Sequence, residues 1–334
     1  MRLIDHILAV VLVIAFTLTI AGPRSAAFAA DPAFQVPAGE RQLFLDDVGV
    51  EKIENLERSI HRPSKRGAVI RSDVGAHGVQ IRSAPAWDLD ERVFKLWLLC
   101  STHTYRTSPD GLHWTAGPRQ TNGVSMAVRD PCDSDPNRRY KAAIGNSGFA
   151  VSADGIDWSR LKVPAVFSSD EANFSYNPKE GLFIHTVKRS GPHGRSVALA
   201  TSRDFEHWKD YGVVFHADDL DQELGRKHID RCYADPARHH PYLNHPSQYK
   251  IDVYNMGVFR YESLYIGIPA MFHRTGVAPA GWEGFAGMRM TEAGRQHVSK
   301  YSSRTGFHHL QLVCSRDLRN WRRLGDRRPF IEPS

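Results

Sequence analysis

The chain has 334 residues, of which 41% are hydrophobic and 24% charged, the composition of an ordinary globular protein with one large domain or two small ones. Its formal net charge is +6, but the basic residues are scattered along the chain. We therefore attribute the charge to solubility and predict no nucleic-acid partner. The sequence has no Gly-rich phosphate loop, Gly-x-Ser-x-Gly elbow or His-Glu-x-x-His segment, so nothing in it supports a nucleotide-binding protein, an esterase or a metalloprotease.

The N-terminus has the pattern of an export signal. Arg2 precedes an apolar run from Ile7 to Ile20, Gly22-Pro23 ends the run, and Ala27-Phe28-Ala29 offers small residues for cleavage. The run is shorter than the roughly 20 residues that span a bilayer. We predict a signal peptide over residues 1–29, with a signal anchor as the alternative. The mature protein is then secreted or periplasmic and has no membrane contact after cleavage.

The next segment, residues 30–69, precedes a set of internal repeats and contains the first acidic motif, Arg41-Gln-Leu-Phe-Leu-Asp-Asp47. The repeats share the spacing Ser-x-Asp-x-x-x-Trp, and their Trp residues are 44, 50 and 113 positions apart. Ser and Asp side chains bond nearby backbone amides and stabilise tight turns, and a Trp can bury its ring against a neighbouring sheet. The four copies are Ser108 to Trp114, Ser152 to Trp158, Ser202 to Trp208 and Ser315 to Trp321.

A repeat of about 40–50 residues with several short strands has the size of a propeller blade. We place three blades at about 70–120, 121–165 and 166–215, and a fourth from Ile251 to about Leu324. The polar stretch 216–250 is predicted to be an inserted loop. The fold class predicted for 70–334 is therefore all-β, a five-bladed β-propeller with four clear blades that is incomplete at the C-terminus. Two alternatives are a ring completed by the segment 42–47 and a β-sandwich with chance turns.

The cysteines and histidines give no metal-binding spacing. The cysteines form no Cys-x-x-Cys pair and allow three disulfide connectivities, although Cys100 and Cys314 lie in apolar runs and are expected to be buried free thiols. The 17 histidines include the pairs His239-His240 and His308-His309. Adjacent residues of a strand point to opposite faces, so neither pair is a ready chelate, and we predict no metal site.

Several motifs resemble those of the five-bladed propeller glycoside hydrolases, the family 32/43-like superfamily of invertases, fructanases and arabinanases, and especially exported bacterial family 32-like glycosyl hydrolases. The resemblance covers about residues 40–334. It rests on the repeated turn and on three acidic motifs, namely Arg41 to Asp47, Arg129-Asp130-Pro131 with Asp135 to Tyr140, and Asp252-Val-Tyr-Asn-Met256 through Tyr261-Glu262. The Asn-Asp-Pro-Asn-Gly motif of invertases is absent, and Ser263 follows Glu262 where the family has Cys.

The resemblance implies three carboxylates at one end of a central channel. Carried over by position, Asp47 (or Asp46) is the nucleophile or base, Asp130 stabilises the transition state, and Glu262 is the acid. Substrate contacts are assigned to Asp46, His77 and Asp252, and Asp252 is also a reserve for either acidic role. We predict no cofactor, with a structural Ca²⁺ as an option that the family leaves open.

Glycoside hydrolysis needs two carboxyl groups across the scissile bond. We therefore predict a glycoside hydrolase-like enzyme whose partner is an oligo- or polysaccharide substrate. One alternative is a non-catalytic propeller that binds a glycan or a protein, and another is a truncated, inactive product. The sequence sets neither the sugar nor the oligomeric state.

Overall fold

The computed structural model describes residues 34–35, 38–71, 79–101, 103–238, 241–288 and 290–332. The predicted signal peptide, His77 and the pair His239-His240 lie outside the described residues. The chain divides into two compact units, Met1–Gln35 and Val36–Ser334. All secondary structure in the described residues belongs to the second unit.

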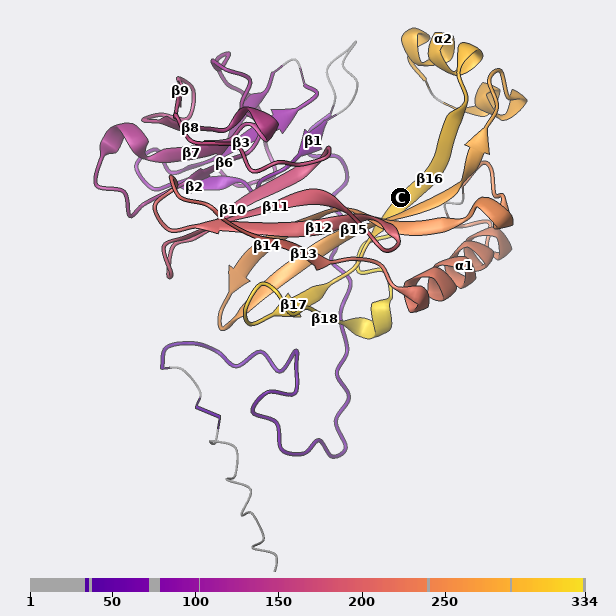
Figure 1. Cartoon of the computed structure of the whole chain (residues 1–334), viewed down its shortest axis with the longest axis horizontal. Coiled ribbons are helices and arrows are strands. Elements are labelled where there is room, and N and C mark those ends of the chain that lie inside the picture. The colour runs from indigo at the N-terminus through magenta and orange to yellow at the C-terminus, as the bar shows by residue number, and fades with distance from the viewer. Residues whose placement is uncertain are drawn as a thin grey trace, which may run out of the picture. The chain divides into compact units, whose positions relative to one another are not determined.

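The described residues form four antiparallel sheets that follow one another along the chain (Figure 1). The first contains β1 (Gln80–Ile81), β2 (Ala86–Asp88), β3 (Val93–Leu99), β4 (Tyr105–Ser108) and β5 (Thr115–Ala116). The second contains β6 (Ala127–Arg129), β7 (Tyr140–Ala143), β8 (Phe149–Ser152) and β9 (Ser159–Arg160). The third contains β10 (Ala172–Asn177), β11 (Leu182–Gly191), β12 (Gly194–Ser202) and β13 (Lys209–Phe215). The fourth contains β14 (Lys250–Tyr261), β15 (Leu264–Ala278), β16 (Ser303–Leu310), β17 (Val313–Ser315) and β18 (Arg322–Arg323).

The described chain is mostly β-sheet, as predicted, but it is not all-β, because it also contains α1 (Asp219–Ala234) and α2 (Glu292–Lys300). In Figure 1 α2 lies at the end of β15 and β16 at the top right, and α1 lies below these strands, where it contacts β14. Helix α1 falls in the stretch that we expected to be a loop. It begins with a reciprocal capping box, in which the side chains of Asp218 and Asp221 each accept the other's backbone N–H. Short 3₁₀ turns are η1 (Pro136–Arg138), η2 (Gly145–Ser147), η3 (Pro246–Gln248), η4 (Glu283–Gly287) and η5 (Gly325–Arg327).

Consecutive sheets contact one another through a strand of each, which is the first strand in every sheet but the first, where it is β2. Strand β2 lies against β6, β6 against β10, and β10 against β14. Each pair of sheets encloses its own apolar core. Trp97 and Tyr140 belong to the core of the first and second sheets, Phe149 and Phe174 to that of the second and third, and the largest cluster joins the third and fourth sheets through residues such as Leu199, Val253 and Tyr265.

The four repeated turns have the hydrogen bonds that their sequence predicts. In each turn the Asp Oδ1 lies 2.9–3.1 Å from the Ser Oγ and accepts the backbone N–H groups two and three residues later. The residue after the Asp has a left-handed backbone in all four turns, at Gly111, Gly155, Phe205 and Leu318. Glycine adopts this conformation without strain, whereas Phe205 and Leu318 adopt it while fully or almost fully buried.

The Trp that closes each turn packs against the preceding sheet. The Trp158 ring lies 6.0 Å from Trp97 of the first sheet, and Trp208 stacks on Phe149 of the second sheet at 4.6 Å. Trp321 packs against the core between the third and fourth sheets. Trp114 belongs to the first described sheet and is only partly buried. The repeated motif therefore joins one sheet to the next.

The segment that carries the first acidic motif covers the outer strands of the fourth sheet. Leu43, Leu45 and Ile60 pack on a buried cluster that includes Ile266 and Cys314. Polar contacts reinforce this packing, because Arg316 pairs with Asp46 and Arg322 pairs with Asp47. Residues 43–60 are therefore integral to the second unit.

The four cysteines, all within the described residues, are free thiols. Cys314 is buried as expected, whereas the expectation for Cys100 was wrong, because Cys100 is exposed. It follows β3 with a φ of 63°, so the chain has already left the apolar strand at this residue. None of the described helices is long and apolar enough to cross a bilayer.

Candidate functional site

A cluster of charged and aromatic side chains surrounds Asp252, the third residue of β14. We call it the Asp252 cluster. One member lies between β1 and β2, and another lies directly before β10. The others belong to β11, β12, β14 and β15. The members are Arg82, Glu171, Lys188, Arg195, Asp252, Tyr254 and Arg274.

The turn between β11 and β12 approaches Asp252 closely at Gly194. This glycine has a φ of +105°, and a Cβ added to it would lie 3.2 Å from Asp252 Oδ2 and 3.2 Å from Lys250 Nζ. A side chain here would be strained by the backbone conformation and would crowd the carboxylate. The glycine therefore allows the hairpin to bring Arg195 next to Asp252.

Asp252 is buried, with 1% of its surface exposed, and two arginines face it at moderate distance. Arg274 Nη2 lies 3.3 Å from Oδ2, and Arg195 Nη1 lies 3.8 Å from Oδ1. Burial raises the pKa of Asp252, and the arginines oppose the rise without cancelling it. Within the described structure Oδ1 has no hydrogen-bond partner, nor has Arg274 Nε. Both groups keep hydrogen-bonding capacity for another molecule.

Aromatic rings form one wall of the cluster. The guanidinium carbon of Arg195 lies 4.9 Å from the ring centre of Tyr254 and 5.3 Å from that of Phe272. Lys188 Nζ lies 4.1 Å from the Tyr254 ring centre, within the range of a cation–π contact. His308 contacts both Tyr254 and Phe272, with ring centres 4.6 and 4.8 Å away. The site thus combines flat apolar surfaces with fixed charges.

A second carboxylate, Glu171, lies on the other side of Tyr254. It pairs with Arg82, and the side chains of both are 9% exposed. Tyr254 also hydrogen-bonds to Glu171, and burial together with the negative charge of Glu171 raises the pKa of Tyr254. Asp170, the residue before Glu171, accepts a hydrogen bond of 2.8 Å from Lys188 Nζ. The cluster therefore holds two largely buried carboxyls that both face arginine: Asp252, whose pKa is raised, and Glu171, which pairs with Arg82.

Asp130, the predicted transition-state stabiliser, directly follows the last residue of β6. It is buried, Lys141 Nζ lies 3.2 Å from its Oδ2, and its Oδ1 accepts the Cys132 N–H at 3.0 Å. Its neighbours Arg129 and Pro131 line a cavity of about 330 Å³. Trp87, Tyr176 and Phe259 also line this cavity, so Asp130 lies beside an aromatic hollow formed by β2, β6, β10 and β14.

The other predicted carboxylates pair with arginines near the N-terminal segment. Asp46 accepts two hydrogen bonds from Arg316, at 2.7 and 2.9 Å. The exposed Asp47 pairs with Arg58 at 2.6 Å and Arg322 at 2.5 Å. Glu262, in the turn between β14 and β15, pairs with Arg41 at 2.6 Å. These contacts lower the pKa of all three carboxyls. Asp47, Asp130 and Glu262 each have a different cationic partner, and the predicted catalytic set remains a prediction.

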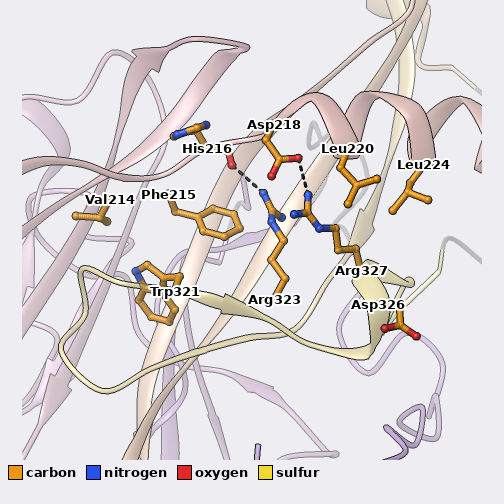
Figure 2. Close-up of a pocket in the computed structure, with 10 residues that line it drawn as sticks. All are labelled: Val214, Phe215, His216, Asp218, Leu220, Leu224, Trp321, Arg323, Asp326 and Arg327. Atoms are coloured by element: carbon orange, nitrogen blue, oxygen red, sulfur yellow. Dashed lines mark hydrogen bonds and ion pairs between the residues drawn. The ribbon is translucent and has the colours of Figure 1, made fainter. Parts of the chain in front are cut away.

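A cavity of about 710 Å³ is lined by none of the predicted site residues (Figure 2). It is lined by the end of β13, the start of α1 and the segment from Trp321 to Arg327. Figure 2 shows Arg323 and Arg327 directed toward His216 and Asp218, with which they bond at 2.8 and 2.5 Å. These cations also pair with the buried Asp221. The arginines of this cavity are thus already occupied by internal partners.

Comparison with known proteins gives partial similarities. No family model matches the chain. A 1,2-beta-oligomannan phosphorylase of Thermoanaerobacter sp. (strain X514) is 26% identical over 129 residues, which cover 36% of this chain and 44% of that protein. The chain therefore aligns with less than half of that relative.

Two solved structures share the same low level of identity. A family 32 β-fructofuranosidase of Bombyx mori is 12% identical, with 74% of this chain and 48% of that chain covered and a TM-score of 0.38. A beta-1,2-mannobiose phosphorylase from Listeria innocua is also 12% identical, with 79% and 66% covered and a TM-score of 0.27.

Asp252 is the only residue of the Asp252 cluster that was predicted as a site residue, although Tyr254 stands in the third acidic motif. The cluster residues that the sequence did not identify are Arg82, Glu171, Lys188, Arg195 and Arg274. For these residues the sequence contained one local indication of a buried charged site. Lys188 lies in a largely buried strand of a long hairpin, where a buried cation is unusual and indicates a partner.

Proposed function

We propose that this protein is a carbohydrate-active enzyme that cleaves glycosidic bonds at the Asp252 cluster. The observation that carries the proposal is the buried Asp252, whose pKa is raised although Arg195 and Arg274 face it. Glycosidic bond cleavage needs a carboxylic acid that keeps its proton at the working pH and a second carboxylate that acts as nucleophile or base. In our assignment Asp252 protonates the leaving oxygen and Glu171 is the second carboxylate.

The surroundings of the two carboxyls suit a sugar substrate. Tyr254 and Phe272 hold Arg195 by cation–π contacts, and this guanidinium is a hydrogen-bond donor for sugar hydroxyls. The unused hydrogen-bonding capacity of Asp252 Oδ1 and Arg274 Nε is available to the glycosidic oxygen and a neighbouring hydroxyl. This assignment moves the acid role from Glu262, whose pKa is lowered, to Asp252, which we had kept in reserve for it.

Phosphorolysis is a second candidate reaction, because cations outnumber acids in the cluster. Arg82, Lys188, Arg195 and Arg274 face Asp170, Glu171 and Asp252, and Asp252 is the acid with the raised pKa. Such an excess of positive charge favours an anionic reactant such as phosphate. The curated relative is itself named a phosphorylase.

For the fold we propose a five-bladed β-propeller of which the described sheets are four blades. The support is the contact between consecutive sheets in chain order, from β2 to β6, β10 and β14. We also propose export with removal of residues 1–29, on the basis of the sequence pattern alone. N-terminal sequencing of protein recovered from the periplasm or medium tests the cleavage, and retention of residue 1 would contradict it.

A glycan panel with the purified protein tests the function. We expect sugar release from at least one oligosaccharide, and Asp252→Asn to lower kcat at least 100-fold, since general acid catalysis contributes about 10²–10⁴. Asp219→Asn, at a side chain 99% exposed, serves as the matched control and keeps the wild-type rate. If Glu262→Gln abolishes turnover while Asp252→Asn does not, the acid is Glu262 and our assignment is wrong.

Inorganic phosphate separates the two reactions. A hydrolase releases free sugar without phosphate, whereas a phosphorylase needs phosphate and releases a sugar phosphate. Glycan binding without turnover under both conditions would support the non-catalytic alternative and contradict the proposed enzyme.

A further inference from the structure

Three buried histidines meet on the side of the fourth sheet that faces α1. His228 belongs to α1, His273 to β15 and His309 to β16, and their exposed fractions are 4%, 0% and 4%. One ring nitrogen from each lies within 4.8 Å of the others. The closest pair is His273 Nε2 and His309 Nδ1, at 2.7 Å. We call these residues the three-histidine cluster.

Local features of the sequence bring the three rings together. In the antiparallel pairing of β15 and β16, Met271 is opposite His309 and His273 is opposite Phe307, so the two histidines are diagonal neighbours on one face. Helix α1 approaches this face at Gly225, where any side chain would collide with Tyr249. One turn of helix beyond Gly225, His228 then faces both strands.

The hydrogen bonds around the cluster fix where the protons are. Gln311 Oε1 accepts a hydrogen bond from Arg323 at 3.0 Å, so its amide nitrogen donates to Arg327 O and is directed at His309 Nε2, 3.4 Å away. His309 Nδ1 then donates to His273 Nε2, and His273 Nδ1 donates to the Tyr249 hydroxyl at 2.8 Å.

All three imidazoles are neutral at ordinary pH. Burial lowers the pKa of His228 to about 4 and that of His309 to about 3, and it holds the pKa of His273 well below its usual value. Neutral imidazole is the form that binds metal ions. The Tyr249 hydroxyl fixes His273 as the Nδ1–H tautomer and directs Nε2 into the cluster, as the outer partners of metal-bound histidines do.

A thiol lies next to the cluster. Cys232 is one turn after His228 on α1, is 3% exposed, and has its Sγ 3.6 Å from His228 Nε2. Three imidazole nitrogens and one thiolate are a ligand set that suits tetrahedral Zn²⁺. Tetrahedral geometry with Zn–N bonds of about 2.0–2.1 Å needs nitrogens about 3.3 Å apart. The His273–His309 contact has to open by about 0.6 Å, and separations of up to 4.8 Å have to close by as much as about 1.5 Å. The proton of His309 has to move to Nε2, and the Gln311 amide has to turn away from it.

We propose that His228, His273 and His309 bind a divalent metal ion of the zinc class, with Cys232 as the fourth ligand. The ion joins α1 to β15 and β16 and has a structural role, since its three histidine ligands are buried and come from separate elements. The proposal does not depend on the glycosidic activity. Sequence spacing did not reveal it, because the ligands come from three separate elements and only His309 belongs to an adjacent pair.

The test uses the full chain without a histidine tag, stripped with a chelator and dialysed against Zn²⁺. We expect one zinc per chain by mass spectrometry of the metal, and a higher Tm with zinc than with chelator. His309→Gln should lower the affinity for zinc at least 100-fold. His308→Gln is the matched control, because His308 is the next residue on β16 and faces Tyr254 and Phe272 instead; it should bind zinc like the wild type.

Cobalt gives a second readout that does not depend on a variant folding. Titration of the wild type with Co²⁺ should give visible bands of tetrahedral cobalt and a near-ultraviolet thiolate band, and Cys232→Ser should lose only the thiolate band. Absence of stoichiometric zinc and of tetrahedral cobalt bands in the wild type overturns the proposal and leaves the cluster as a hydrogen-bonded core. Equal zinc binding by wild type and His309→Gln would also overturn it.

Discussion

Asp252 and Asp46 are both nearly buried aspartates that face arginine, yet their environments move their pKa values in opposite directions. Asp46 receives two short hydrogen bonds from Arg316, and these outweigh the effect of burial and lower its pKa. The side chains of Arg274 and Arg195 contact Asp252 at 3.3 and 3.8 Å, and with the backbone N–H of Arg195 they lower its pKa less than burial raises it. Contact geometry rather than the presence of an arginine thus distinguishes a structural carboxylate from one that can deliver a proton.

The largest expected difference between the two aspartates is in catalysis. Asp252→Asn keeps the shape of the side chain and removes the proton donor, so kcat should fall at least 100-fold. Asp46→Asn should change kcat less than threefold, because Asp46 binds the N-terminal segment to the fourth sheet. Steady-state kinetics on the same glycan measures both, and a larger loss in Asp46→Asn would reverse the assignment.

Stability should show the opposite order. Asp46→Asn removes two charge-assisted hydrogen bonds from a site with 8% exposure, and we expect a loss of about 1–3 kcal/mol in the free energy of unfolding at pH 7. Because the folded pKa of Asp46 is lowered, its contribution is present above the unfolded pKa and is lost as pH falls through the folded value. Denaturant melts of wild type and Asp46→Asn should therefore converge at acid pH.

Asp252→Asn should raise stability by about 1 kcal/mol at pH 7, a typical gain when a strained active-site group is replaced. The folded pKa of Asp252 is raised, so ionisation of this carboxyl costs stability once the pH exceeds the unfolded pKa. That cost is absent below the unfolded pKa, and the advantage of the variant should disappear there. The same melts, repeated from neutral to acid pH, give the result. A variant that is less stable than wild type at pH 7 would show that the arginines stabilise the ionised form.

The smallest effect is expected at Asp47. Its side chain is 58% exposed, and its ion pairs with Arg58 and Arg322 are on the surface, where solvent and salt screen them. Asp47→Asn should leave Tm within experimental error in moderate salt and leave kcat unchanged. A loss of turnover with normal folding would instead support the role that the family resemblance assigns to Asp47.

The sequence predicted what depends on local spacing. The Ser-x-Asp-x-x-x-Trp turns, their backbone hydrogen bonds and the antiparallel sheets between them follow from residues a few positions apart, from Ser152 to Trp158 for example. Helix α1 was missed because the Asp218-x-x-Asp221 cap precedes a polar helix with a weak apolar face, and the polar composition suggested a loop.

The candidate site depends on contacts that no local pattern contains. Asp252 meets Arg195 only because Gly194 lets a hairpin from the preceding sheet approach β14. Glu171 likewise pairs with Arg82, which lies about 90 positions earlier in the chain. Family resemblance led to Asp47 and Glu262 because they stand in recognisable acidic motifs, and it could not show that arginines pair with both.

The most direct test of this account is to measure the pKa of Asp252. Protein labelled with ¹³C at aspartate carboxyls, compared with the Asp252→Asn variant to assign the signal, gives this pKa from chemical shift against pH. The account predicts a midpoint clearly above the 3.8 of an ordinary aspartate. A midpoint at or below that value would mean that Arg195 and Arg274 hold Asp252 ionised, and the proposed proton donor would not exist.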